Sequence, residues 1–259
     1  MTSQRETIVK HPESGRVSPN LLDYDETRKA FSWEEARRRL DGLPGGRGLN
    51  IAHEAVDRHA NGPGAVRVAL RLIGRTGERR DLTYAALSQQ TNRFANALEH
   101  LGVRKGDVVA TLAGRIPELY VAALGTLKRG AIYCPLFSAF GPDPIISRLQ
   151  IARARVLVTT ESLYRRKVEP LRAQLPYLEH VLLVREGSEP VPAGTRDLRA
   201  LLGDMSEAFT IGPTDPDDLA LLHFTSGTTG RPKGAMHVHA AVVAHDVTAW
   251  YALDLHPED

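Results

Sequence analysis

The spacing of hydrophobic positions changes repeatedly along the chain, which predicts short strands alternating with helices. The clearest helix begins at Thr83, a suitable N-cap, and ends at Gly102, a residue typical of helix ends. Leu82 and Leu87 have the spacing of a hydrophobic staple around that cap. The residues that share the apolar face of this helix are Leu87, Thr91, Phe94, Ala95, Leu98 and Leu101.

The rest of the chain continues this alternation. Short apolar runs predict strands over residues 66–72, 107–112, 131–136, 155–159, 180–184 and 219–224. Helical spacing predicts helices over residues 50–60, 117–130, 144–152, 163–174 and 239–253, and a short one near 196–202 inside an otherwise loop-like stretch, 185–217. The pattern is typical of an α/β fold with mostly parallel sheets flanked by helices. Ligands of such sheets bind beyond the carboxyl ends of the strands.

The first 47 residues are polar and rich in proline and glycine, so we predict an extended arm over residues 1–47. One short helix is expected near residues 32–40, where Ser32 can act as N-cap and Glu35 can complete a capping box. We predict that residues 48–259 form a single domain.

Composition and charge argue against several classes of protein. The 33 basic and 31 acidic residues leave a net charge of +2 without a dense basic block, which gives nucleic-acid binding little support. No apolar run is long enough to span a membrane, and the first residues lack the apolar core of a signal peptide. The single cysteine, Cys134, excludes an internal disulfide and suits a reducing cytoplasm. We expect it to be a small buried hydrophobic residue.

Residues 225–234, TSGTTGRPKG, carry the strongest chemical signal and directly follow the predicted strand 219–224. Glycines let the backbone N–H groups approach an anion closely, hydroxyls add donors, and Lys233 adds a positive charge for phosphate oxygens. The spacing is not that of a Walker A loop, because Pro232 stands where that motif has glycine and Gly234 follows the lysine. The alternative interpretation is a plain surface loop after a strand.

This loop resembles the phosphate-loop signature of the acyl-adenylate-forming superfamily, which includes acyl-CoA synthetases, peptide-synthetase adenylation domains and beetle luciferases. The resemblance extends, in the family's order, over residues 82–87, 92–93, 102–110, 117–119 and 127–136. Residues 48–59 and 135–143, the latter leading to Arg148 and Leu149, resemble the AMP-forming acetyl-CoA synthetases within it.

The resemblance implies a two-step reaction that uses ATP, Mg²⁺ and coenzyme A. A carboxylic acid, with acetate favoured, is first adenylated with release of pyrophosphate, and the thiol of CoA then displaces AMP. The implied ATP-phosphate residues are Thr225, Ser226, Gly227, Thr228, Thr229, Gly230 and Lys233. Lys233 and His239 are the implied catalytic residues, with His239 facing the acyl-adenylate pocket. We assign no metal ligands, because His237, His239 and His245 lack a fourth partner for a closed zinc site.

Coenzyme A needs cations for its 3′-phosphate and a surface for its adenine. In acetyl-CoA synthetases these come from a Phe-Gly turn, matched here by Phe140 and Gly141, and from arginines in the next strand–helix unit, near which lie Arg165, Arg166 and Lys167. The alternative for this basic group is a solvated helix face.

The family's later blocks, which contribute adenine, ribose and Mg²⁺ contacts, and its mobile C-terminal domain do not occur in these 259 residues. We therefore expect the chain to be an N-terminal piece of such a synthetase, inactive alone and poorly soluble because its sheet is incomplete. Three alternatives stay open: a synthetase for a longer or aromatic acid, a non-catalytic ATP- or AMP-binding protein, and a peptide-synthetase adenylation domain. The stretch 137–143 argues against the last.

Overall fold

The structure, a computed structural model, describes residues 17–188, 190–225 and 232–256. The chain divides into two compact units. Residues 41–241 form the larger unit, and residues up to Leu40 together with those from Val242 form the smaller one. The predicted division into 1–47 and 48–259 therefore stays a prediction.

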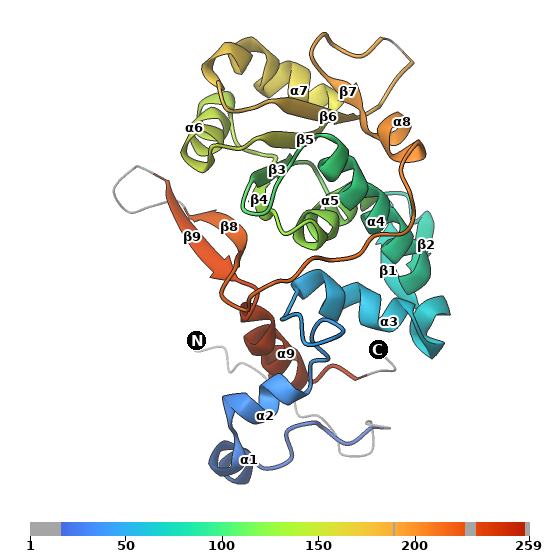
Figure 1. Cartoon of the computed structure of the whole chain (residues 1–259), viewed down its shortest axis with the longest axis vertical. Coiled ribbons are helices and arrows are strands. Elements are labelled where there is room, and N and C mark those ends of the chain that lie inside the picture. The colour runs from blue at the N-terminus through green and yellow to red at the C-terminus, as the bar shows by residue number, and fades with distance from the viewer. Residues whose placement is uncertain (1–16, 189, 226–231, 257–259) are drawn as a thin grey trace, which may run out of the picture. The chain divides into compact units, whose positions relative to one another are not determined.

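The larger unit is built on a seven-stranded sheet in the order β7-β6-β5-β3-β4-β8-β9, shown in Figure 1. The strands are β3 (Val108–Leu112), β4 (Ile132–Leu136), β5 (Val156–Thr160), β6 (His180–Val184), β7 (Arg196–Asp197), β8 (Leu219–Thr225) and β9 (Lys233–Val238). All neighbouring pairs are parallel except β8 and β9, which form an antiparallel hairpin. The predicted α/β fold with a mostly parallel sheet is confirmed.

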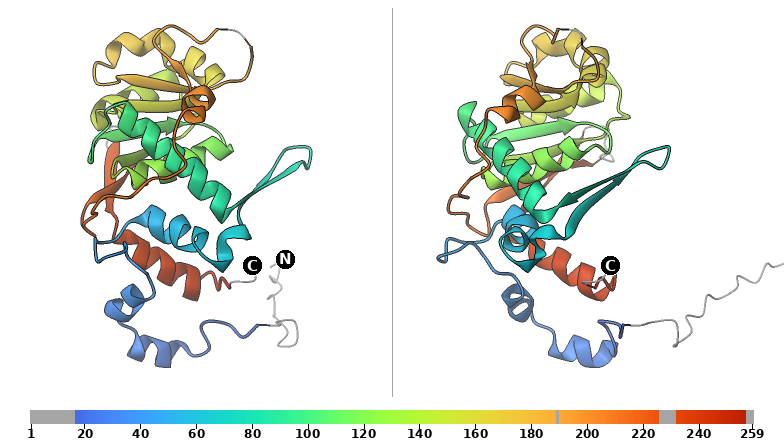
Figure 2. Two further views of the ribbon diagram at one scale, coloured as in Figure 1. Left: turned by 45° about the vertical axis from the view of Figure 1, so that its right-hand side comes forward. Right: turned by 90° about the vertical axis from the view of Figure 1, so that its right-hand side faces the viewer.

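Helices cover both faces of this sheet (Figure 2). Helices α4 (Tyr84–His100), α5 (Pro117–Lys128) and α8 (Leu198–Gly203) pack on one face, and α6 (Pro142–Ala152) and α7 (Glu161–Lys167) on the other. The two-residue period of a strand explains how one sheet serves both layers. In β5, Val156 and Val158 join the core under α4 and α5, whereas Leu157 joins the core under α6 and α7.

The predicted helix ends of α4 and α5 are confirmed. The Thr83 hydroxyl accepts the N–H of Ala86, and all six residues of the predicted apolar face of α4 are buried. Pro117 opens α5 in its first turn, where its missing N–H costs nothing. Gly102 and Gly130 follow the two helices with φ of 74° each, in the left-handed region that glycine enters without strain.

Several elements differ from the predictions. The single helix expected over 163–174 is α7 followed by a 3₁₀ helix, Glu169–Gln174, because Pro170 in its first turn interrupts the α-helical bonding. The helix over 50–60 contains a π-helical turn, His53–Asp57. The predicted strand near 66–72 is β1 (Val68–Ile73), but its antiparallel partner β2 (Arg79–Thr83) was not predicted. Nor were β7 and β9.

The smaller unit contains α1 (Tyr24–Ala30), α2 (Trp33–Arg38) and α9 (Ala241–Tyr251), of which α1 was not predicted. The Ser32 hydroxyl accepts the N–H of Glu35, so the predicted N-cap of α2 is confirmed. The expected capping box is different, because the Glu35 carboxylate pairs with Arg38. Among the described residues, no helix has both the length and the apolar character needed to cross a membrane.

Candidate functional site

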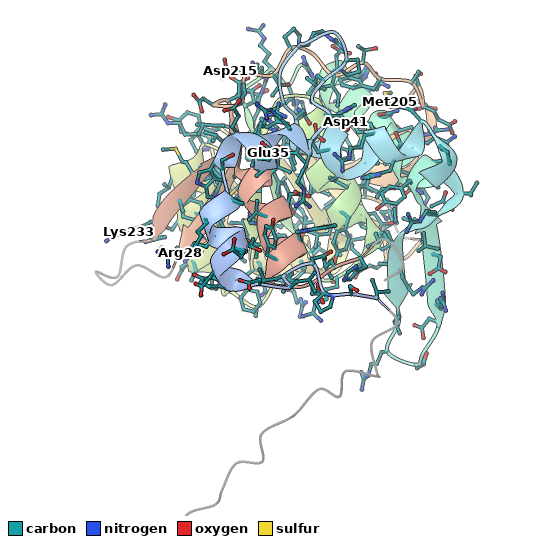
Figure 3. All side chains as sticks on the ribbon, turned by 90° about the horizontal axis from the view of Figure 1, so that it is seen from below. Arg28, Glu35, Asp41, Met205, Asp215 and Lys233 are labelled. Carbon is teal, nitrogen blue, oxygen red and sulfur yellow. The ribbon has the colours of Figure 1, made fainter. Side chains whose placement is uncertain are left out.

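The predicted phosphate loop joins β8 to β9. Residues 226–231, which include Ser226, Gly227, Thr228, Thr229 and Gly230, lie outside the described residues. The two ends of the loop are described: Thr225 and Lys233 are register partners, and the Thr225 hydroxyl donates to the Lys233 carbonyl oxygen at 3.4 Å. Both residues are exposed, and Figure 3 shows Lys233 projecting outward from the start of β9. The loop therefore leaves the carboxyl end of a parallel strand, where ligands of such sheets bind.

Gly234 lies beside the lysine and directly against a side chain of the neighbouring strand. A Cβ at this position would lie 2.7 Å from Cδ1 of Leu222 on β8, closer than side-chain carbons approach one another. A larger residue would therefore require the Leu222 side chain to shift.

The predicted CoA turn follows the carboxyl end of β4. Phe137 is 63% exposed, and its ring packs edge-on against Phe140 with centroids 5.4 Å apart. Gly141 is the N-cap residue of α6. The Lys167 ammonium reaches this turn from α7 and donates to the carbonyl oxygens of Ser138 and Phe140, at 2.6 and 2.5 Å. Lys167 thus connects α7 to the backbone of this turn through two hydrogen bonds.

The two predicted CoA arginines are engaged elsewhere. Arg165 pairs with Glu161 at 2.8 Å, and Arg166 donates from Nε to the carbonyl oxygen of Ser162 in its own helix. Hydrogen bonds from Arg165, the largest cause, and from Arg185 lower the pKa of Glu161. Of the three basic residues at the end of α7, Lys167 is the one seen to contact the Phe140 turn.

Arg148 on α6 is a further residue at this end of the sheet that sequence reasoning did not assign to the site. Only 7% of it is exposed. Its guanidinium carbon lies 4.4 Å from the ring centroid of Phe140 and 5.8 Å from that of Phe224, the residue before Thr225. The sequence did offer a signal for this residue. Arg148 lies on the helix face of Ile145, Leu149 and Ala152, which are apolar and buried, so a charged residue at this position is unusual.

His239, the predicted pocket histidine, is fully buried just after β9. Its Nδ1 accepts the N–H of Ile51 at 3.1 Å, so the proton of the neutral ring is on Nε2. That Nε2 is buried and finds no hydrogen-bond partner among the described residues. Burial lowers the pKa of His239 to about 4; nearby Lys105 adds to this and Asp218 opposes it. The ring is therefore neutral at pH 7. His237, two residues earlier, is exposed on β9.

Cys134 on β4 is fully buried, as expected, and burial raises the pKa of its thiol to about 12. A thiol that stays protonated at neutral pH is a weak nucleophile, so Cys134 acts as a core residue of the sheet.

Comparison with known proteins agrees with this geometry. The family model described as "AMP-binding enzyme" matches residues 56–259, and the chain belongs to this family. Relatives of this chain include acyl-CoA synthetases. The chain is 38% identical over 243 residues to an acetyl-coenzyme A synthetase of Bacillus subtilis, and 34% identical over 241 residues to a 3-hydroxypropionyl-coenzyme A synthetase of Metallosphaera sedula. These alignments cover 93% and 86% of this chain.

Two solved structures share the fold. An acyl-CoA synthetase of Brucella canis superposes with a TM-score of 0.76 at 34% identity, over 85% of this chain and 39% of its own. An anthranilate CoA ligase in complex with anthranoyl-AMP superposes with a TM-score of 0.68 at 25% identity, over 85% and 37%. The chain spans 41% of the Bacillus subtilis relative and 35% of the Metallosphaera sedula relative.

Proposed function

We propose that this chain is part of an AMP-forming acyl-CoA synthetase that converts acetate, ATP and CoA into acetyl-CoA, AMP and pyrophosphate. The observation that carries the proposal is the β8–β9 hairpin, which presents the ends of a glycine- and hydroxyl-rich loop, Thr225 and Lys233, at the carboxyl end of a parallel strand in a chain of the AMP-binding family. Acetate is favoured because the relatives of 34–38% identity include several acetyl-coenzyme A synthetases.

In the proposed first step a carboxylate oxygen attacks the α-phosphorus of ATP, and the bond to the bridging oxygen breaks to release pyrophosphate. Negative charge grows on the departing group, and the loop donors with Lys233 stabilise it. The residues assigned to this role are Thr225, Ser226, Gly227, Thr228, Thr229, Gly230 and Lys233. Nδ1 of His239 already accepts the Ile51 N–H, and burial lowers the pKa of the ring to about 4, so its proposed role is to shape the acyl pocket and hold Ile51 rather than to transfer a proton.

In the second step the CoA thiolate attacks the acyl carbon and AMP leaves. Phe140 and Gly141 are the proposed surface for CoA, and Arg165 and Arg166 the proposed cations for its phosphate, with Lys167 supporting the turn. A chain with one buried thiol suits the reducing cytoplasm, where we place the reaction.

Magnesium is expected to accompany ATP. Within the part of the chain that the structure describes, no group of three or more histidine, cysteine, aspartate or glutamate side chains could hold a metal ion. Because Mg²⁺ usually needs only one or two carboxylates beside the phosphates of its substrate, we propose that it enters bound to ATP, and no step above depends on it.

The test is carboxylate-dependent ATP–pyrophosphate exchange with acetate, propionate, 3-hydroxypropionate and benzoate. It is measured on this chain and on any longer product of its reading frame. Exchange that is strongest with acetate supports the proposal, and a preference for another acid corrects the substrate. Absence of exchange in every product moves the function to a non-catalytic nucleotide-binding protein.

Lys233→Met tests the loop within the same assay. Losing a charge-assisted hydrogen bond to phosphate is expected to lower the exchange rate by about ten- to a hundredfold. Lys29→Met, which removes an exposed lysine of α1 paired with Glu26, is the matched control and leaves exchange unchanged.

A further inference from the structure

Arg148 is a buried cation whose hydrogen bonds are incomplete. Nη1 donates to the carbonyl oxygen of Pro144 at 2.9 Å, one turn earlier in α6. Nε is buried and has no hydrogen-bond partner among the described residues. Nη2 makes no hydrogen bond within the described part of the chain either, but it is not among the fully buried unpaired atoms. Two adjacent donors of one guanidinium, the buried Nε and the less buried Nη2, therefore have no hydrogen-bond partner among the described residues.

No carboxylate of the described residues forms an ion pair with Arg148. The rings of Phe140 and Phe224 offer cation–π attraction, which is weaker than a paired anion. Removing a guanidinium from water without a counter-charge is unfavourable, and buried charges in proteins are normally paired. Among the described residues, Arg148 thus has no anionic partner.

The position of the Arg148 guanidinium indicates which kind of partner it binds. Phe224 directly precedes Thr225 at the carboxyl end of β8, and Phe140 belongs to the turn that follows the carboxyl end of β4. Strands β4 and β8 are parallel neighbours, so both strand ends lie at the same edge of the sheet. The adjacent N–H groups of a guanidinium match two oxygens of one phosphate group in a bidentate arrangement.

We propose that Arg148 is an anion-binding residue that takes a phosphate group, from the oligophosphate of ATP or of CoA, through Nε and Nη2. The inference rests on the proposed function, since that function brings both ligands to this edge of the sheet. It adds to the predicted loop a contact from α6 and gives the buried guanidinium its missing counter-charge.

The experiment compares the wild-type chain with Arg148→Met, which keeps the length and apolar stem of the side chain. Binding of inorganic pyrophosphate, ATP, CoA and dephospho-CoA is measured by calorimetry, and stability without ligand by urea unfolding. We expect Arg148→Met to weaken binding of at least one of these ligands by about ten- to a hundredfold. Without ligand the variant is expected to be as stable as wild type or more stable, because an unpaired buried charge is removed.

Two further variants complete the series. Arg148→Lys keeps the charge without the bidentate geometry and should bind with intermediate affinity. Arg153→Met is the matched control: Arg153 is the exposed C-cap of the same helix and lies over the ring of Tyr177 at 5.2 Å. Its substitution should leave the affinity for all four ligands unchanged.

The ligand whose affinity falls identifies the source of the phosphate: ATP and pyrophosphate, or CoA. Equal affinity in wild type and Arg148→Met, together with lower stability of the variant, would show that Arg148 only clamps the two rings, and the proposed function would stand. If Arg148→Met does not fold, wild-type affinity in Arg148→Lys overturns the inference in the same way. A wild-type chain that binds none of the four ligands would overturn the inference about Arg148, whereas the proposed function is tested separately by the ATP–pyrophosphate exchange of the longer product.

Discussion

Two buried cations on opposite faces of the same sheet have opposite surroundings. The Lys128 side chain, at the end of α5, is completely buried, and its ammonium lies 2.5 Å from the Asp57 carboxylate and 2.7 Å from the Asn92 side-chain oxygen. Arg148, on α6, has a carbonyl oxygen and two aromatic rings but no carboxylate among the described residues. The comparison teaches that a buried charge with a full set of partners belongs to the fold, whereas one that lacks its anion is available to a ligand.

The strongest test of the comparison removes the partner of Lys128. Asp57→Ala leaves a fully buried ammonium without its counter-charge, and we expect the free energy of unfolding to fall by about 3–5 kcal/mol. Urea unfolding measures this. Burial already lowers the pKa of Lys128, and Asp57 opposes that effect, so the loss should be smaller at high pH, where the lysine deprotonates.

The control is Asp81→Ala, which breaks ion pairs with Arg71 and Arg79 on the exposed β1–β2 hairpin and should change stability far less than Asp57→Ala does. A loss of similar size in Asp57→Ala and Asp81→Ala would mean that the buried pair is not needed, and the contrast with Arg148 would disappear.

His239 is a second buried side chain with an unpartnered nitrogen, and its effect on stability should depend on pH in a definite direction. Its pKa is about 4 in the fold against 6.5 in a free side chain, so the unfolded state binds the proton first. Its contribution to stability is complete above pH 6.5 and is lost as the pH falls toward 4, by about 3 kcal/mol at 1.4 kcal/mol per pH unit. Unfolding measured between these pH values in wild type and His239→Asn gives this contribution by difference.

The asparagine side chain in this variant keeps an acceptor for the Ile51 N–H but cannot titrate, so the variant should lose less stability across that range. His59 and His180, whose pKa values are also lowered by burial, remain in both proteins and cancel. Asp218 has a lowered pKa and loses its contribution below its ordinary 3.8, outside the range. Parallel pH profiles of the two proteins would contradict a buried neutral His239.

The fold could be predicted where local chemistry determined it. The cap at Thr83, the buried face of α4 and the parallel strands all depend on residues close in sequence. Strand β9 was missed because it is exposed along most of its length, so its residues show no two-residue alternation. The helix predicted over 163–174 was too long. Pro170 indicates a break in the helix, but the helical spacing of the neighbouring apolar residues was given more weight.

The candidate site divides in the same way. The phosphate-loop residues follow from a local motif, whereas Lys167 beneath the Phe140 turn and Arg148 beside Phe224 depend on contacts between separate elements. Lys128 and Asp57 are 71 residues apart, and no pattern in either segment pairs them. Whether a buried cation has a partner is a property of the tertiary structure, so sequence reasoning could not separate Lys128 from Arg148.

Close packing on the Lys128 face should make that face intolerant of added volume. A Cβ at Gly125 of α5 would lie 2.8 Å from Phe94 side-chain atoms and from the Thr91 carbonyl oxygen of α4. We expect Gly125→Ala to lower the free energy of unfolding by about 1–3 kcal/mol despite the better helix propensity of alanine. Gly203→Ala, at a helical glycine with no atom within 4 Å of the new Cβ, is the control and should be neutral or slightly stabilising in the same urea titration.

The smallest stability effect is expected on the other face, at Lys167. Its ammonium is only partly buried and has carbonyl partners, so Lys167→Met should lower the free energy of unfolding by about 1 kcal/mol. Because those carbonyls belong to the proposed CoA turn, CoA affinity measured by calorimetry should fall more than stability does.

Arg166→Met, on the exposed side of α7, separates the two predicted CoA contacts. A fall in CoA affinity with Lys167→Met alone assigns CoA to the turn, and a fall with Arg166→Met alone assigns it to the helix face. If neither variant changes CoA affinity, neither Lys167 nor Arg166 contributes to CoA binding. ATP is then the favoured source of the phosphate that Arg148 is proposed to bind.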